Sequence, residues 1–189
     1  MRWEGHFTVP GRADDLIVLF DDPVLMARYL PGAEVDSVEP DGSVNGAITV
    51  RFGPKRLKFR GIAIPTIDRL ARTGSVEGRG ASDVRGARFK VRMDYALTDT
   101  GTEANPQVRV SLVSVAELQG PLAEIARTGG PIVAGAILDE FARRLRDDLE
   151  NPDAAPPATG DNALSAWKIA RSAIARAVTR RDGGDRERT

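Results

Sequence analysis

The chain has 189 residues, of which 41% are hydrophobic, with 27 basic and 27 acidic residues, one histidine and no cysteine. This length fits one domain plus a terminal segment, because domains cluster at roughly 100 to 150 residues. The lack of cysteine excludes a disulfide scaffold, an iron–sulfur cluster, a thiolate zinc site and a cysteine nucleophile. A single histidine, His6, leaves no polyhistidine metal centre, so we expect no bound metal and few possible enzyme chemistries.

The first thirty residues predict one strand followed by two short helices. Apolar residues that follow Asp14 and Asp15 indicate a helix, because acidic side chains stabilise the positive end of a helix. Asp22 followed by Pro23 is typical of an N-cap and a first helical position, so a second helix starts there. The expected ranges are 3–9 for the strand, 12–20 for the first helix and 23–29 for the second.

After Gly32 the apolar period changes to two, which predicts a run of antiparallel strands. The clearest pattern lies in residues 87–97, where apolar and charged side chains alternate. Such alternation means that one face of the sheet is dry and the other is exposed to water. The expected strands cover 44–52, 56–64, 75–80 with a weaker signal, 87–97 and 107–116.

A helical apolar period returns from Ile132 to Leu149 and predicts one long amphipathic helix. The order of elements indicates an α+β domain, in which a curved antiparallel sheet wraps around a long C-terminal helix and two short helices follow the first strand. The domain is expected to cover residues 1–150. A sheet that curves strongly around one helix rarely fills completely, so we expect a cavity between them.

Five short motifs occur in order along the domain: Phe7-x-Val9-Pro10, Asp22-Pro23, Leu30-Pro31-Gly32, Val50-x-x-Gly53-Pro54 with Phe59-x-Gly61, and Leu138-x-x-Phe141. Together they resemble the carbon monoxide dehydrogenase G-subunit family, which belongs to the START-like (SRPBCC) helix-grip superfamily of ligand-binding proteins. The resemblance covers residues 1 to about 150. It implies a helix-grip fold and a non-catalytic accessory protein of a molybdenum hydroxylase similar to carbon monoxide dehydrogenase. It also implies a hydrophobic ligand without a covalent link, a quinone such as menaquinone, for electron transfer to the quinone pool.

Large side chains expected to face the helix are candidates to line the ligand site, although the same positions would be plain core in a filled domain. They are Met26, Tyr29, Phe52, Phe59, Phe89, Met93, Tyr95, Leu112, Leu138 and Phe141. No catalytic residue is assigned. Two alternatives stay open: a START-like cyclase, hydrolase or dehydratase acting on an aromatic or polyketide substrate, and a structural assembly factor with a filled core. Catalysis would need converging polar groups, and the inward positions offer only Tyr29, Tyr95 and Ser114.

The C-terminal segment is expected to consist of a proline- and alanine-rich linker (151–161), a basic amphipathic helix (162–181) and a disordered tail (182–189). The helix carries five basic residues, no acidic residue and one apolar arc, which is typical of a helix at a membrane interface. The expected membrane-binding residues are Trp167, Lys168, Arg171, Ile174, Arg176, Arg180 and Arg181. Alternatively, the segment packs on its own domain, a second copy or a partner enzyme, or is disordered.

The N-terminal residues lack the apolar stretch of a signal peptide, so we expect a cytoplasmic protein that associates peripherally with the inner face of the cell membrane. Residues 51–60 contain five cations interleaved with aromatic residues, a pattern that could suit nucleic acid. Strand alternation places these cations on the outer face or in the turn. We therefore expect a solvated face, or a docking patch for an acidic partner or a membrane, and no nucleic acid.

Overall fold

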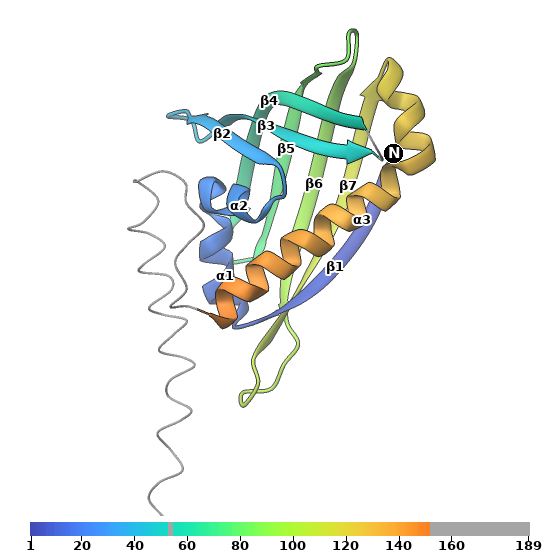
Figure 1. Cartoon of the computed structure of the whole chain (residues 1–189). Coiled ribbons are helices and arrows are strands. Elements are labelled where there is room, and N and C mark those ends of the chain that lie inside the picture. The colour runs from blue at the N-terminus through green and yellow to red at the C-terminus, as the bar shows by residue number, and fades with distance from the viewer. Residues whose placement is uncertain (53–54, 152–189) are drawn as a thin grey trace, which may run out of the picture.

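The computed structural model describes residues 1–52 and 55–151 and contains one curved antiparallel sheet (Figure 1). The strand order in the sheet is β1-β7-β6-β5-β4-β3-β2, so the first two strands of the chain form its two edges. The strands are β1 (Arg2–Pro10), β2 (Ala33–Val38), β3 (Val44–Phe52), β4 (Lys55–Asp68), β5 (Thr73–Ser82), β6 (Arg88–Asp99) and β7 (Gln107–Gln119). The predicted linker beyond Asn151, the predicted helix and the predicted tail lie outside the described residues.

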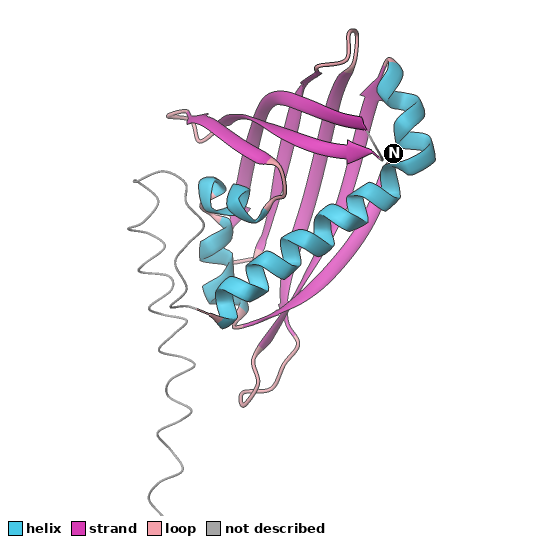
Figure 2. Cartoon of the chain, in the orientation of Figure 1, coloured by secondary structure: helices cyan, strands magenta, loops and turns pink. Residues whose placement is uncertain are grey.

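The helices of the described residues cover one face of this sheet, as Figure 2 shows. They are α1 (Ala13–Phe20), α2 (Pro23–Tyr29) and α3 (Pro121–Glu150). The predicted cap of α2 is present, because the Asp22 carboxylate accepts hydrogen bonds from the backbone N–H groups of Val24 and Leu25, each at 3.0 Å. The expected architecture, a curved antiparallel sheet around a long C-terminal helix with two short helices after the first strand, is confirmed.

We call the face of the sheet that packs against the helices the inner face. Its larger hydrophobic cluster joins α1, α2 and α3 to β1, β6 and β7 and includes fully buried Val9, Val108 and Leu145. Aromatic rings fill this end of the domain, with centroids 5.2 to 6.5 Å apart: Phe7, Phe20, Tyr29, Tyr95 and Phe141. A second, smaller cluster at the other end consists of Leu57, Ala87 and Leu122, with Phe59, Val84 and Leu118 packed against it.

Two elements differ from the sequence-based expectation. Strand β2 was not expected, because an edge strand that pairs with β3 alone keeps many polar residues and has little apolar alternation. Helix α3 starts at Pro121 instead of Ile132, so it continues through Gly129, Gly130 and Pro131. Proline inside a helix removes one hydrogen bond and bends the axis, and the first turns of α3 run at an angle to the rest in Figure 1.

Three glycines form a row across the inner face, because Gly46 pairs with Gly61 and Gly61 pairs with Gly80. A Cβ atom on any of them would collide with a backbone carbonyl oxygen of a neighbouring strand: that of Glu34, Arg79 and Arg60, respectively. Backbone atoms cannot rotate away as a side chain can. Neighbouring strands therefore approach each other here more closely than any other residue type would allow.

Candidate functional site

The inner face between the two hydrophobic clusters is the candidate ligand site. A row of small residues crosses four strands in register there: Ala63 on β4, Gly78 on β5, Val91 on β6 and Ala116 on β7. All four are half-buried, although they lie on the same face as the buried clusters. We call them the small-residue row.

Open space lies over this row at Gly78 and beside Gly135 of α3. A Cβ atom added to Gly78 would meet only Val91, at 2.9 Å, and a backbone oxygen of Ile62, at 4.0 Å, so no atom of α3 packs there. A Cβ atom added to Gly135 of α3 would meet nothing within 4 Å outside its own helix. Since most protein interiors are close-packed, this uncovered apolar surface can accept a hydrophobic ligand.

The inner face is almost free of charge. Among the inward positions of β3 to β7 whose side chains are described, the one charged residue is Asp99 at the end of β6. The Asp99 carboxylate accepts a hydrogen bond from the backbone N–H of Ala13 at 2.8 Å and thereby caps α1. It is thus occupied in holding α1 and lies away from the small-residue row.

The ten predicted lining residues divide between the two ends of the inner face. Tyr29, Tyr95 and Leu112 are buried in the larger cluster, and Met26, Met93, Leu138 and Phe141 pack against it. Phe59 and Phe89 lie at the other end, with their rings in edge-to-face contact at 5.6 Å. Phe52 ends β3, and its side chain is outside the described part of the structure. Contact of these residues with a ligand stays a prediction.

The two tyrosine hydroxyl groups lie at the filled end of the inner face. Tyr29 donates a hydrogen bond to the Asp148 carboxylate at 2.8 Å, which ties α2 to α3. Tyr95 lies directly over Gly74, where a Cβ atom would collide with the hydroxyl oxygen. Neither hydroxyl group is therefore presented at the small-residue row, whereas Ser114, two residues before Ala116 on β7, brings a hydroxyl group to the same face.

The titration of Tyr95 gives a test of its burial. Desolvation, assisted by the negative charge of Asp21, raises the pKa of Tyr95 from 10.0 to about 12. An acid whose pKa is higher in the folded state stabilises the fold below its unfolded pKa and loses this contribution as pH rises towards the folded value. We expect stability to fall more steeply between pH 10 and pH 12 in the wild type than in Tyr95→Phe. Urea unfolding across this range measures it, and identical curves for both proteins would contradict the prediction.

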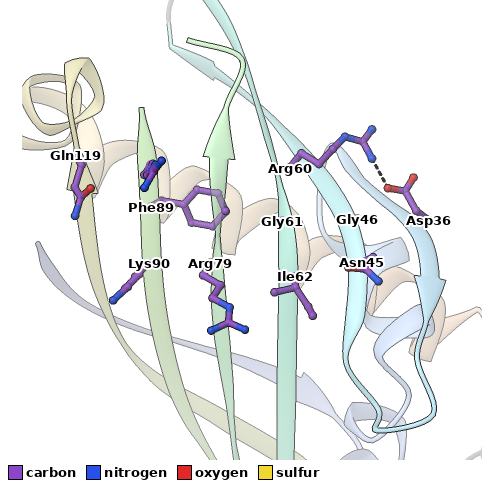
Figure 3. Close-up of a pocket in the computed structure, with 12 residues that line it drawn as sticks. Asp36, Asn45, Gly46, Arg60, Gly61, Ile62, Arg79, Phe89, Lys90 and Gln119 are labelled. Carbon is purple, nitrogen blue, oxygen red and sulfur yellow. Dashed lines mark hydrogen bonds and ion pairs between the residues drawn. The ribbon is translucent and has the colours of Figure 1, made fainter. Parts of the chain in front are cut away.

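Two hollows lie on the outer face of the sheet. The larger, of about 810 Å³, crosses from β2 to β7 and is shown in Figure 3. The smaller, of about 430 Å³, lies over β1, β7 and β6 beside the exposed His6. Of the ten predicted lining residues, only Phe89 contributes to the larger hollow.

The described residues contain no group of three or more histidine, aspartate or glutamate side chains that could hold a metal ion. Within the same part of the chain, no helix combines the length and the apolar character needed to cross a bilayer.

No protein-family model and no curated protein matches this chain. Solved structures do match: a conserved protein from Geobacillus kaustophilus has a TM-score of 0.67 at 14% identity, over 78% of this chain and 94% of that one. A protein from Thermus thermophilus has a TM-score of 0.61 at 14% identity, over 82% of this chain and 100% of that one. The chain has the START-like helix-grip fold.

Similarity at these identities shows the fold alone. A truncated norcoclaurine synthase from Thalictrum flavum also matches, with a TM-score of 0.46 at 18% identity over 77% of this chain and 92% of that one. This likeness is too distant to carry an argument about activity. The helix-grip fold expected from the sequence motifs is therefore shown, and the narrower G-subunit family is not confirmed.

Sequence reasoning missed the small-residue row because it searched for large side chains. In the sequence, the glycine-rich stretch 75–80 gives only a weak strand signal. Alternation with a period of two places Gly74, Gly78 and Gly80 on one face, and the structure puts that face towards the helices. Glycine at inward positions of a strand was the available signal for uncovered space.

Proposed function

We propose that this chain is a non-catalytic carrier of a hydrophobic ligand, a quinone such as menaquinone, held on the inner face of the sheet. The observation that carries the proposal is the small-residue row, which adjoins open space at Gly78. A quinone ring with an isoprenoid chain is flat and largely apolar, so it suits an inner face with little charge. Ser114 offers a hydroxyl group for a quinone carbonyl at the edge of this row.

The few polar groups on the inner face favour ligand binding over catalysis. General acid–base chemistry needs a titratable side chain within hydrogen-bonding reach of the substrate. Tyr29 donates a hydrogen bond to Asp148, Tyr95 lies over Gly74 at the filled end, and Asp99 caps α1. The small-residue row is thus flanked by surface that can hold a ligand and by few groups that could transform it.

The second part of the proposal concerns partners and location. The motif resemblance supports an accessory role for a molybdenum hydroxylase similar to carbon monoxide dehydrogenase. The basic, amphipathic sequence of residues 162–181 supports peripheral binding to the inner face of the cell membrane, because each cation near an anionic leaflet contributes about 1 kcal/mol. The protein would then recruit the enzyme to the membrane and pass its electrons to the quinone pool.

Vesicle flotation tests both parts in the full-length protein. The wild type is expected to float with anionic phospholipid vesicles that contain menaquinone and to remain in the bottom fraction when the vesicles are neutral. After release from the anionic vesicles by salt, it should retain quinone. The double variant Trp167→Ser/Ile174→Ser should float about tenfold less, since two buried apolar side chains are lost, while still taking quinone from detergent micelles. Ser172→Ala, on the polar side of the same predicted helix, is the matched control.

The outcomes separate the two parts of the proposal. Flotation of the double variant at the wild-type level would contradict the role of residues 162–181. A wild-type protein that retains no quinone after release would contradict the carrier role.

A further inference from the structure

The larger hollow on the outer face forms a groove across six strands, with glycine backbone as its floor. Gly46, Gly61 and Gly80 line it, flanked by the side chains of Ile62 and Arg79 (Figure 3). Strands are spaced about 4.8 Å apart, so the groove from β2 to β7 is roughly 24 Å long. This length accommodates an extended polypeptide of about seven residues at roughly 3.4 Å per residue.

Three cations line the β5–β6 part of the groove without an ion-pair partner among the described residues: Arg79, Arg88 and Lys90. Their neighbours on the outer face are paired. Lys58 contacts Glu34 at 2.7 Å, and Arg60 contacts Asp36. Some cations of this face thus have carboxylate partners, whereas the three cations of the β5–β6 part, like Arg51 and Arg56 outside the groove, have none among the described residues.

The register places like charges against each other. Arg79 on β5 is directly opposite Lys90 on β6, and Arg88 is two residues from Lys90 on the same strand. Like charges directly opposite in a sheet destabilise the fold. An anionic group seated between these cations would relieve the repulsion, so their placement favours a ligand with several carboxylates.

We propose that the outer groove binds an extended, acidic segment of a partner polypeptide. A segment that follows the groove crosses the strands, so its carboxylates can reach Arg79 on β5 and Lys90 on β6, which lie side by side across the groove. The amide side chain of Gln119 on β7 lies in the groove and can bond to peptide groups, whereas the amide of Asn45 on β3 already donates hydrogen bonds to Ser37 and Glu39. This inference concerns a different face from the ligand site and goes beyond the proposed carrier function.

Two other anionic partners fit the groove less well. A bilayer surface is broad and flat, so it cannot follow a recessed floor between long side chains. A nucleic-acid strand needs a continuous basic track with several stacking aromatic rings. Here Asp36 lies in the groove, and the carboxylate of Glu77 pairs with Arg92 nearby on the same face.

Peptide binding by the full-length protein tests the proposal. The probe is a fluorescein-labelled peptide of about eight residues with glutamate at alternate positions, and its glutamine counterpart is the control probe. We compare Arg79→Gln/Lys90→Gln with Arg51→Gln/Arg56→Gln by fluorescence anisotropy. Arg51 and Arg56 are also directly opposite each other on β3 and β4, unpaired among the described residues, and outside the groove. Both variants therefore remove two positive charges from the same sheet.

We expect the acidic peptide to bind and the glutamine peptide not to bind. Affinity should fall about tenfold in Arg79→Gln/Lys90→Gln and less than about twofold in Arg51→Gln/Arg56→Gln. The midpoint temperature of peptide-free Arg79→Gln/Lys90→Gln should rise, since the repulsion is removed. Equal losses in both variants, or no binding to the wild type, would overturn the proposal. The proposal would also be overturned if phosphatidylglycerol vesicles or a single-stranded oligonucleotide bound in place of the peptide and this binding depended on Arg79 and Lys90.

Discussion

Replacing Gly61 with alanine is expected to lower the free energy of unfolding by about 3 kcal/mol, the upper part of the usual range for an overpacked site. The added Cβ would collide with the carbonyl oxygen of Arg79 and lie 3.0 Å from the Cα of Gly80. Both atoms belong to the backbone of a central strand, so relief requires β4 and β5 to move apart. In a domain of this size, the change corresponds to a fall in midpoint temperature of roughly 10 °C.

Gly135→Ala is the matched control, because the same methyl group is added where nothing lies within 4 Å. Gly135 is inside α3, where alanine is favoured over glycine by up to about 1 kcal/mol, so this variant should be slightly more stable than the wild type. Urea unfolding followed by circular dichroism measures both variants. Equal stability of Gly61→Ala and the wild type would show that the strands at the glycine row can separate at little cost.

Replacing Ala63 with phenylalanine is expected to reduce binding of a menaquinone-type quinone at least about tenfold. Ala63 lies on the inner face opposite Gly78, so a phenyl ring there would enter the open space of the small-residue row. The ring would take the volume that the quinone needs and leave the charge of the face unchanged. Ile64→Phe adds a similar ring one residue along β4, on the outer face, where Ile64 is 39% exposed.

Quinone retained after gel filtration, measured by extraction, compares the two variants with the wild type. The inner-face site is supported if Ile64→Phe retains as much quinone as the wild type and Ala63→Phe retains less. Wild-type retention in Ala63→Phe would place the ligand elsewhere on the protein.

Much of the fold could be predicted because local sequence and tertiary packing agree. The Asp22 cap satisfies the first N–H groups of α2, while the alternation in β6 and the apolar stripe of α3 each mark one dry face, which the structure buries. Prediction failed where tertiary contacts override local preference. The first turns of α3 persist despite Gly129, Gly130 and Pro131, since Leu122 is buried against Leu57 and Ala87.

The candidate site was harder to predict than the fold. Periodicity shows that Tyr95 and Leu112 face inwards, but it cannot show that aromatic rings fill one end while Ala63 and Gly78 leave the middle open. That difference depends on where α3 crosses the sheet, which is a property of distant residues. The unpaired state of Arg79 and Lys90 likewise depends on cross-strand register, which the sequence of either strand alone does not specify.

Fluorescence of Trp3 during quinone titration tests the central claim most directly. Trp3 lies on the inner face of β1, opposite Ser114, and its ring and Leu138 both crowd Gly5. The chain has two tryptophans, so a Trp167→Ser variant leaves Trp3 as the sole reporter. Quinones quench nearby tryptophan emission. We predict saturable quenching by menaquinone in Trp167→Ser and its loss when Ala63→Phe is added. Emission that stays unchanged across the titration would contradict a quinone site on the inner face.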